Sequence, residues 1–316
     1  MIKKDIYQGN LKDQLKASAK DRLHRFILAD GMLRGAIVNS TCMVNQMRAN
    51  HELGPMETLI LGQAYIAAAL LTASLKGRDR ISMHIECSGK LNGLDVESNA
   101  FGEVRGYLKN PNFSNNLSGR ESTLSSLFGA GFLTVTKYLE DAKTPYSGKI
   151  MLEYGSIAED LANYFVQSEQ TPTAFSLSVH FNEQQEVDGA GGIFLQAMPD
   201  AQESKIAEAE DIIRQISLTT ETDLSIGAAF AKDIEPDHIV LEKFEKMTPL
   251  LLGNYRTEFF CRCNQNTMQR YISRLPVEDL IDIAQNGPFP LEIRCHHCNT
   301  VYNFSQPDIE CMLKGC

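Results

Sequence analysis

The chain has 316 residues, of which 43% are hydrophobic, with 22 glycines and 11 prolines. This length and composition exclude a disordered tail or a collagen-like repeat, and they suffice for more than one folded unit. The formal net charge of −10 opposes binding to nucleic acid and to anionic membranes. The first 21 residues, "MIKKDIYQGNLKDQLKASAKD", contain no continuous apolar segment of the kind found in secretory signals. We therefore expect a cytoplasmic protein.

Residues 1–199 are predicted to form an α+β core domain built on a sheet. Helices interrupt its strand-like segments without the regular alternation of a doubly wound fold. Runs typical of strands lie at 25–28, 35–40, 81–87, 132–139, 174–181 and 192–198.

The uncharged stretch 58–75, "TLILGQAYIAAALLTASL", is just long enough to span a membrane. Gly62, Gln63, Thr72 and Ser74 interrupt it, and its alanine content suits a helix packed inside a domain. We expect a core helix and no membrane contact.

The glycines of "GAGG" at 189–192 precede a strand-like run instead of a Lys-Ser/Thr pair and a helix. That context argues against a phosphate-binding loop. We expect these glycines to form the turn of a hairpin.

Residues 200–256 are predicted to be a helical linker. The segment holds six basic and twelve acidic residues, and Ile206, Ala209, Ile213 and Ile216 recur at the spacing of one helical face. Such an apolar stripe must pack on other parts of the chain, and the neighbours on both sides are the expected supports.

Residues 257–316 are predicted to form a small C-terminal domain. Helical patterns at 267–275 and 277–284 are followed by a hairpin with arms at 291–295 and 300–304, and a short helix follows Ser305. About sixty residues with so few core positions need an additional stabilising element.

Four of the eight cysteines lie in this domain as two tight pairs, which can place four sulfurs around one zinc ion. Thiols stay reduced in the cytosol, so paired cysteines there indicate metal or redox chemistry. His296 or His297 could replace one sulfur. The predicted zinc ligands are Cys261, Cys263, Cys295 and Cys298.

Four thiolates on zinc leave a charge of about −2. Arg262 and Arg294, with either neighbouring histidine, are positioned in the sequence to offset this charge. Zinc also keeps the sulfurs deprotonated, and therefore reactive toward oxidants. Oxidation to Cys261–Cys263 and Cys295–Cys298 disulfides would remove the ligands and release the metal.

The remaining cysteines receive no function from their patterns. Cys42 and Cys87 are expected to be small buried hydrophobic residues. Cys311 is predicted to be exposed on the last helix, although alternative or intermolecular disulfides of Cys311 and Cys316 stay open.

The chain resembles the heat-shock protein 33 family of redox-regulated holdase chaperones over nearly its whole length. The resemblance lies in "RLHRFIL" (22–28), "LRGAIVN" (33–39), "YFVQSEQTPT" (164–173), "AGGIFLQAMP" (190–199) and the C-x-C and C-x-x-C pairs. It implies a non-enzymatic protein that is inactive while reduced and zinc-bound. Oxidation would unfold the zinc switch and the linker, so that the protein binds unfolding client proteins without ATP; a homodimer is an option for the oxidised form.

Two other functions compete with this interpretation. A zinc-ribbon nucleic-acid binder is disfavoured, because residues 257–316 carry five basic and seven acidic residues. A thiol oxidoreductase using Cys295 and Cys298 is disfavoured, because its C-x-x-C would normally lie at a strand-to-helix junction, and here it is predicted to lie in a hairpin bend.

Overall fold

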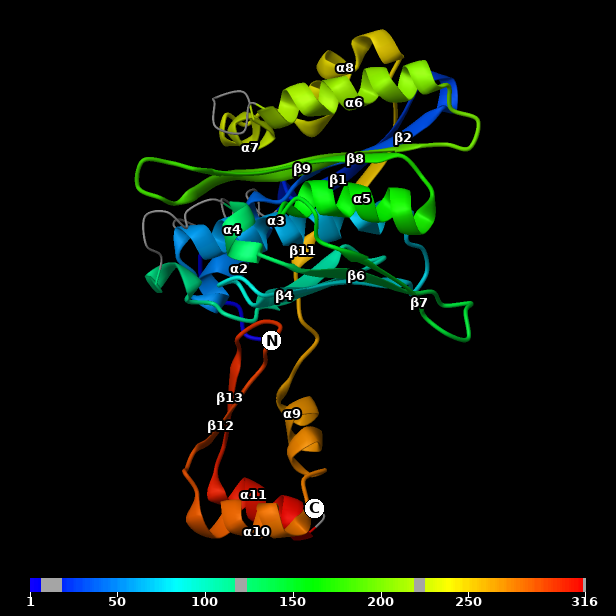
Figure 1. Cartoon of the computed structure of the whole chain (residues 1–316). Helices are drawn as coiled ribbons and strands as arrows, with labels where there is room; N and C mark the ends of the chain where they lie inside the picture. The colour runs from blue at the N-terminus through cyan, green and yellow to red at the C-terminus, as the bar shows by residue number, and fades with distance from the viewer. Residues whose placement is uncertain (7–18, 117–123, 219–224, 315–316) are drawn as a thin grey trace.

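The computed structural model describes residues 1–6, 19–116, 124–218 and 225–314. Helices and sheets alternate in four layers, and a smaller C-terminal module lies below the last of them (Figure 1). From the top these layers are helices α6 to α8, a five-stranded sheet, helices α2 to α5, and a six-stranded sheet. The predicted α+β fold with a sheet-based core is confirmed.

The first sheet is antiparallel throughout. Strand β10 pairs with β1, although it belongs to the segment predicted to be a helical linker. The helical periodicity of 206–216 does not reach these residues, whose backbone groups find partners on β1 instead. The strands, in sheet order, are β10 (Leu250–Arg256), β1 (Arg22–Leu28), β2 (Leu33–Asn39), β9 (Val187–Ala197) and β8 (Thr173–Phe181).

The second sheet faces the helices on one side only. In β3, Ile81, Met83 and Ile85 are buried and alternate with more exposed residues, as expected for a strand with one covered face. Strand β11 pairs parallel to β5 and leads the chain to Cys261. The strands, in order, are β11 (Glu258–Phe259), β5 (Glu103–Leu108), β4 (Gly93–Asn99), β3 (Arg80–Cys87), β6 (Gly131–Tyr138) and β7 (Tyr146–Met151).

Helix α3 (Pro55–Leu71) runs through the middle layer and is the predicted core helix. The helical stretch Pro55–Ser74 passes a length and hydropathy test for a membrane span, but 78% of its most apolar window is buried inside the protein. The two sheets and the neighbouring helices cover it. Those helices are α2 (Thr41–His51), α4 (Leu124–Phe128) and α5 (Ile157–Glu169).

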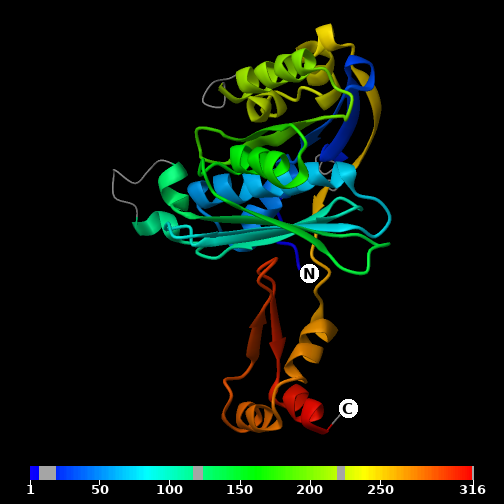
Figure 2. The same cartoon turned by 45° about the vertical axis from the view of Figure 1, so that its right-hand side comes forward.

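Helices α6 (Glu203–Leu218), α7 (Ile226–Ala231) and α8 (Pro236–Lys243) cover the outer face of the first sheet. The predicted apolar stripe of α6 packs there, since Ala209, Ile213 and Ile216 are buried in one cluster with residues of β1, β2 and β9. Both views place these helices on the opposite side of the molecule from the C-terminal module (Figures 1 and 2). Among the described residues, the neighbour that supports the stripe is the core and not the C-terminal module, so the expectation that both neighbours support it is wrong.

The glycines at 189–192 lie inside β9, so the predicted hairpin turn at these residues is also wrong. The turn lies before them, where Asn182 N donates to Glu186 O. The glycines are needed for packing: a Cβ on Gly189 would lie 1.9 Å from the carbonyl oxygen of Gly227 in α7, and one on Gly191 would lie 2.2 Å from the Phe230 ring. Their small size lets α7 lie directly on the sheet.

The C-terminal module has the predicted elements. Leu280 and Ala284 of α10, Ile309 and Met312 of α11, and Phe304 of β13 are buried within it. The division of the chain at 199/200 and 256/257 stays a prediction. The elements are α9 (Gln265–Ile272), α10 (Val277–Asn286), β12 (Leu291–Arg294), β13 (Val301–Phe304) and α11 (Gln306–Lys314).

Candidate metal centre

Two chain segments bring the four cysteines together at the top of the module. Cys261 and Cys263 follow β11, whose pairing with β5 fixes their place beside the second sheet. Cys295 and Cys298 lie in the bend between β12 and β13, where both Cys298 N and Asn299 N donate to Cys295 O. Asn299 takes a left-handed conformation with φ of 56°, which closes the turn.

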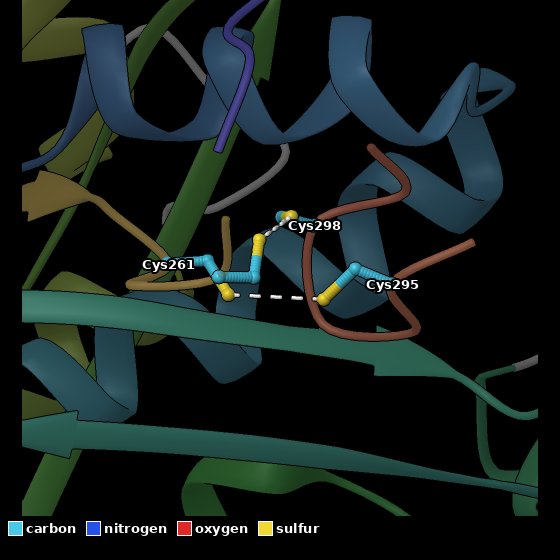
Figure 3. Close-up of side chains that lie close together, drawn as sticks. Cys261, Cys295 and Cys298 are labelled. Atoms are coloured by element: carbon cyan, nitrogen blue, oxygen red, sulfur yellow. Dashed lines mark hydrogen bonds between the residues drawn. The ribbon is translucent and has the colours of Figure 1, made fainter. Parts of the chain in front are cut away.

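The sulfurs form one compact, buried cluster (Figure 3). All four ligand atoms lie within 4.8 Å of one another. The Cys261–Cys295 sulfur distance is 3.8 Å and the Cys263–Cys298 distance is 3.3 Å. Zinc–sulfur bonds of about 2.3 Å in a tetrahedron give sulfur–sulfur edges of about 3.8 Å, so the cluster fits a structural metal site. We call these four residues the cysteine cluster.

Side chains from the hairpin and from the core contact these sulfurs. Tyr302 Oη donates to Cys263 Sγ at 3.1 Å, and Thr300 Oγ1 lies 3.2 Å from Cys298 Sγ. Arg105 of β5 donates from Nη1 to Cys261 Sγ at 3.4 Å. The core sheet therefore supplies a cation directly to the cluster.

This finding corrects the predicted source of the compensating charge. Arg262 makes two hydrogen bonds of 2.8 Å to the carboxylate of Glu103, so its charge is already paired. Arg294 donates to Asn299 Oδ1 in the hairpin bend. Proximity in sequence did not identify Arg105, which lies 156 positions before Cys261 and reaches it only through strand pairing.

The two histidines of the bend pack on the core and not on the sulfurs. Their rings lie 5.7 Å (His296) and 5.5 Å (His297) from the ring of Tyr107. His297 O also accepts a hydrogen bond from Gly106 N of β5. Among the described residues, the group able to hold a metal contains the four cysteines and no histidine.

Sulfur–sulfur hydrogen bonds shift the pKa values of the four cysteines in opposite directions. The bond with Cys263 raises the pKa of Cys261, but the bonds with the other pair outweigh it and lower this pKa to about 6. Hydrogen bonds from the other three sulfurs also lower the pKa of Cys263, that with Cys261 most strongly. Hydrogen bonds with Cys261 and Cys263 raise the pKa values of Cys295 and Cys298. Thiolate character therefore lies on the Cys261–Cys263 pair, and metal binding would require Cys295 and Cys298 to lose their protons as well.

The other cysteines lie away from the cluster. Cys87 is buried as predicted, whereas Cys42, in the first turn of α2, is only half-buried. Cys311 is half-buried and not fully exposed. Cys316 lies outside the described residues.

The buried side chain of Asn50, on α2, connects the core to the cluster. Its Nδ2 donates to Cys298 O at 3.1 Å and to Ile2 O at 2.9 Å, and its Oδ1 accepts from Lys4 N and from Gln46 Nε2. Its own carbonyl accepts from Asn299 Nδ2. One core side chain thus holds both the hairpin bend and the first residues of the chain.

The first residues also contact the cluster directly. Cys261 N donates to Met1 Sδ at 3.0 Å, Met1 N donates to Cys263 O, and Ile2 N donates to Thr300 Oγ1. Nothing in the residue pattern indicated this contact, because the segment carries no motif and pairs with residues some 260 positions away.

Comparison with known proteins places the chain in a family. The family model described as "Hsp33 protein" matches residues 21–305. The chain is 33% identical to the 33 kDa chaperonin of Ruminiclostridium cellulolyticum, covering 93% of this chain and 98% of the relative, and 32% identical to that of Agathobacter rectalis, covering 92% and 98%. A crystal structure of the 33 kDa chaperonin of Thermotoga maritima matches with a TM-score of 0.79 and 29% identity over 94% of this chain and 98% of that one. The chain belongs to the Hsp33 family of chaperones.

Proposed function

We propose that this protein is a redox-regulated, ATP-independent holdase of the cytoplasm that binds unfolding client proteins under oxidative stress. The observation that carries the proposal is the buried cysteine cluster, which joins the module to the core through Arg105 and Asn50. A cluster in this position can act as a latch, because whatever breaks it also loosens the docked module. The chain works by binding and not as an enzyme.

In the reduced protein, zinc is held by Cys261, Cys263, Cys295 and Cys298. Structural zinc contributes apparent binding energies on the order of 10–16 kcal/mol in small peptides, and this energy becomes folding energy. The module needs it, since Tyr271, Val277 and Ile281 stay substantially exposed and few apolar side chains form its interior.

Oxidation converts each pair into a disulfide. One thiolate attacks hydrogen peroxide to give a sulfenic acid and hydroxide, and the second thiolate displaces another hydroxide as the sulfur–sulfur bond forms. Two sulfurs thus lose two electrons to one peroxide, and two peroxides oxidise the cluster. The short sulfur contacts named above join one pair to the other, so disulfides within Cys261–Cys263 and Cys295–Cys298 require the cluster to rearrange.

Loss of the latch is transmitted to the linker along the chain. Strand β11 beside β5 and strand β10 beside β1 are consecutive, and they join the cluster to α8. When the module unfolds, β11 loses the anchor that follows it, and β10 is the edge strand that loosens next. Release of α6 to α8 then exposes the apolar face around Ile213 and Ile216 to clients. In this scheme residues 1–199 are the core, 200–256 the linker and 257–316 the switch.

The test is a comparison of reduced and peroxide-treated protein. We expect one zinc per reduced chain, none after full oxidation, and suppression of a model protein's aggregation only in the oxidised form and without ATP. Size measurement of both forms tests for an oxidised homodimer. Zinc retained after complete oxidation of the four cysteines would refute the switch, and catalytic disulfide reduction would favour the oxidoreductase instead.

A further inference from the structure

Arg105 approaches the cysteine cluster from outside the module. It lies on β5 opposite Glu97 of β4, and this cross-strand carboxylate accepts hydrogen bonds from its Nε and Nη2. The remaining nitrogen, Nη1, donates to Cys261 Sγ at 3.4 Å. Because Glu97 fixes the plane of the guanidinium, the direction of the N–H bond toward the sulfur is set by the core sheet.

The backbone beside Arg105 is tied to both partners of the interface. Gly106 O accepts from Tyr65 Oη of the core helix α3, and Gly106 N donates to His297 O in the hairpin bend. These hydrogen bonds therefore fix the position of β5 relative to the cysteine cluster at the residue next to Arg105. This guanidinium is part of a built contact and not a surface side chain that reaches the sulfur by chance.

We propose that Arg105 is a positioning residue that holds the metal-bound Cys261 thiolate and restrains its oxidation. This inference rests on the proposed function and adds the core residue that sets how readily the switch responds. A charge-assisted hydrogen bond to a thiolate stabilises its negative charge and makes the sulfur a weaker nucleophile. The guanidinium therefore favours the metal-bound state and slows attack on peroxide.

The surroundings of Arg105 support its role in restraining the oxidation of Cys261. It lines a cavity of about 620 Å³ together with Phe260 and Arg262. Cys261 is 0% exposed, and its sulfur accepts a hydrogen bond from this guanidinium. Arg105 thus borders both this cavity and the buried sulfur, and its loss would open an approach from the cavity for a small oxidant.

Arg262 provides a matched control. It lines the same cavity and adjoins Cys261 in sequence, but its Nε and Nη2 both bind Glu103. Arg262→Gln removes the same charge from the same cavity without removing a contact to a sulfur. A general electrostatic effect would appear in both variants, and a positioning effect would appear only in Arg105→Gln.

The experiment uses full-length Arg105→Gln, Arg105→Lys, Glu97→Gln and Arg262→Gln. Zinc affinity is measured by chelator competition, the sulfur-to-metal charge-transfer band is recorded on Co²⁺-substituted protein, and zinc release is followed after hydrogen peroxide is added. We expect Arg105→Gln to lower zinc affinity by about 10- to 100-fold, as for other residues that orient metal ligands. It should also shift the Co²⁺ band and speed zinc release by about threefold for each pK unit of added sulfur basicity.

Arg105→Lys keeps the charge and should show smaller effects than Arg105→Gln. Glu97→Gln should also give a smaller change in the same direction. Because several variants test the same contact, a folding defect in one of them does not decide the result. Arg262→Gln should match the wild type. Equal affinities, spectra and release rates in Arg105→Gln and Arg262→Gln would overturn the inference. Absence of zinc release from the oxidised wild type would instead refute the proposed function, while the Co²⁺ spectra would still test the contact.

Discussion

The core and the C-terminal module are stabilised by different means. Thirteen of the 17 residues of α3 are buried, whereas only Leu280 and Ala284 are buried among the ten residues of α10. Each fully buried aliphatic side chain contributes about 1.5–3 kcal/mol, so apolar burial is the main contribution that holds α3 in place. The module has few such residues, and in the proposed mechanism it depends on its sulfurs and on contacts with the core. We therefore expect an oxidant to act on the module and leave the core folded.

The most severe test removes one sulfur. Cys298→Ser should abolish zinc binding under conditions where the wild type holds one ion, because it removes one of the four ligands. Much of the zinc-binding energy, on the order of 10–16 kcal/mol, is lost with that ligand. Hydrogen exchange should show loss of protection over 257–314 while α3 stays protected. Cys87→Ala is the control, since Cys87 is buried outside the cluster. Equal protection of the module in both variants would contradict its dependence on metal.

The next test moves the disturbance to the linker. Ile213→Asp places a charge at a position that is 4% exposed against the first sheet. It should remove about 1.5–3 kcal/mol of apolar burial, with a further cost for the buried charge. Hydrogen exchange over 203–218 should accelerate, and holdase activity should rise in the reduced state with zinc still bound. Leu241→Asp, on the exposed face of α8, is the control. If reduced Ile213→Asp protein is inactive and its linker amides stay fully protected, Ile213 does not hold the linker in the inhibited state, and the prediction is wrong.

The third test concerns the contact between the core and the C-terminal module, at Asn50. Asn50→Ala removes the buried donor to Cys298 O, which costs about 1–3 kcal/mol. It also removes one donor to Ile2 O, which Thr300 Oγ1 still contacts. The module should exchange faster over 295–304 and respond to less oxidant, with zinc stoichiometry unchanged. Asn45→Ala is matched, because Asn45 lies on the same helix but donates to Val187 O of β9. Identical exchange rates and oxidant responses in the two variants would show that Asn50 does not hold the module on the core.

The last test concerns a titratable group in the core, and its effect is confined to the pH dependence of stability, away from the cysteine cluster. Burial raises the pKa of Asp21 to about 7, against hydrogen bonds from Cys42 N and Met43 N that lower it. The folded state therefore binds the proton more tightly than the unfolded state, and the free energy of unfolding falls as pH rises from about 4 to about 7. The slope is at most about 1.4 kcal/mol per pH unit. Urea unfolding of Asp21→Asn should show a shallower pH dependence over that window, and an unchanged slope would contradict it.

The grouping of the four cysteines could be predicted from the sequence, because it depends on local features. Two short cysteine pairs, a hairpin bend and a module with little core are each contained within a few residues, and all three appear in the structure. The strand runs of the core and the apolar stripe at Ala209, Ile213 and Ile216 were predictable for the same reason, since periodicity is a local property.

Tertiary structure alone decided what surrounds the site. Arg105 and Asn50 reach the cluster because β5, α2 and the hairpin pack together across 156 and 248 positions of sequence, and residue spacing carries no record of such contacts. The same holds for the glycines of β9, which serve close packing of α7 where a turn was expected. It also holds for the linker, whose support is one sheet and not two neighbours. A side chain's type specifies what it can bind, but only the packed chain determines which partner it meets.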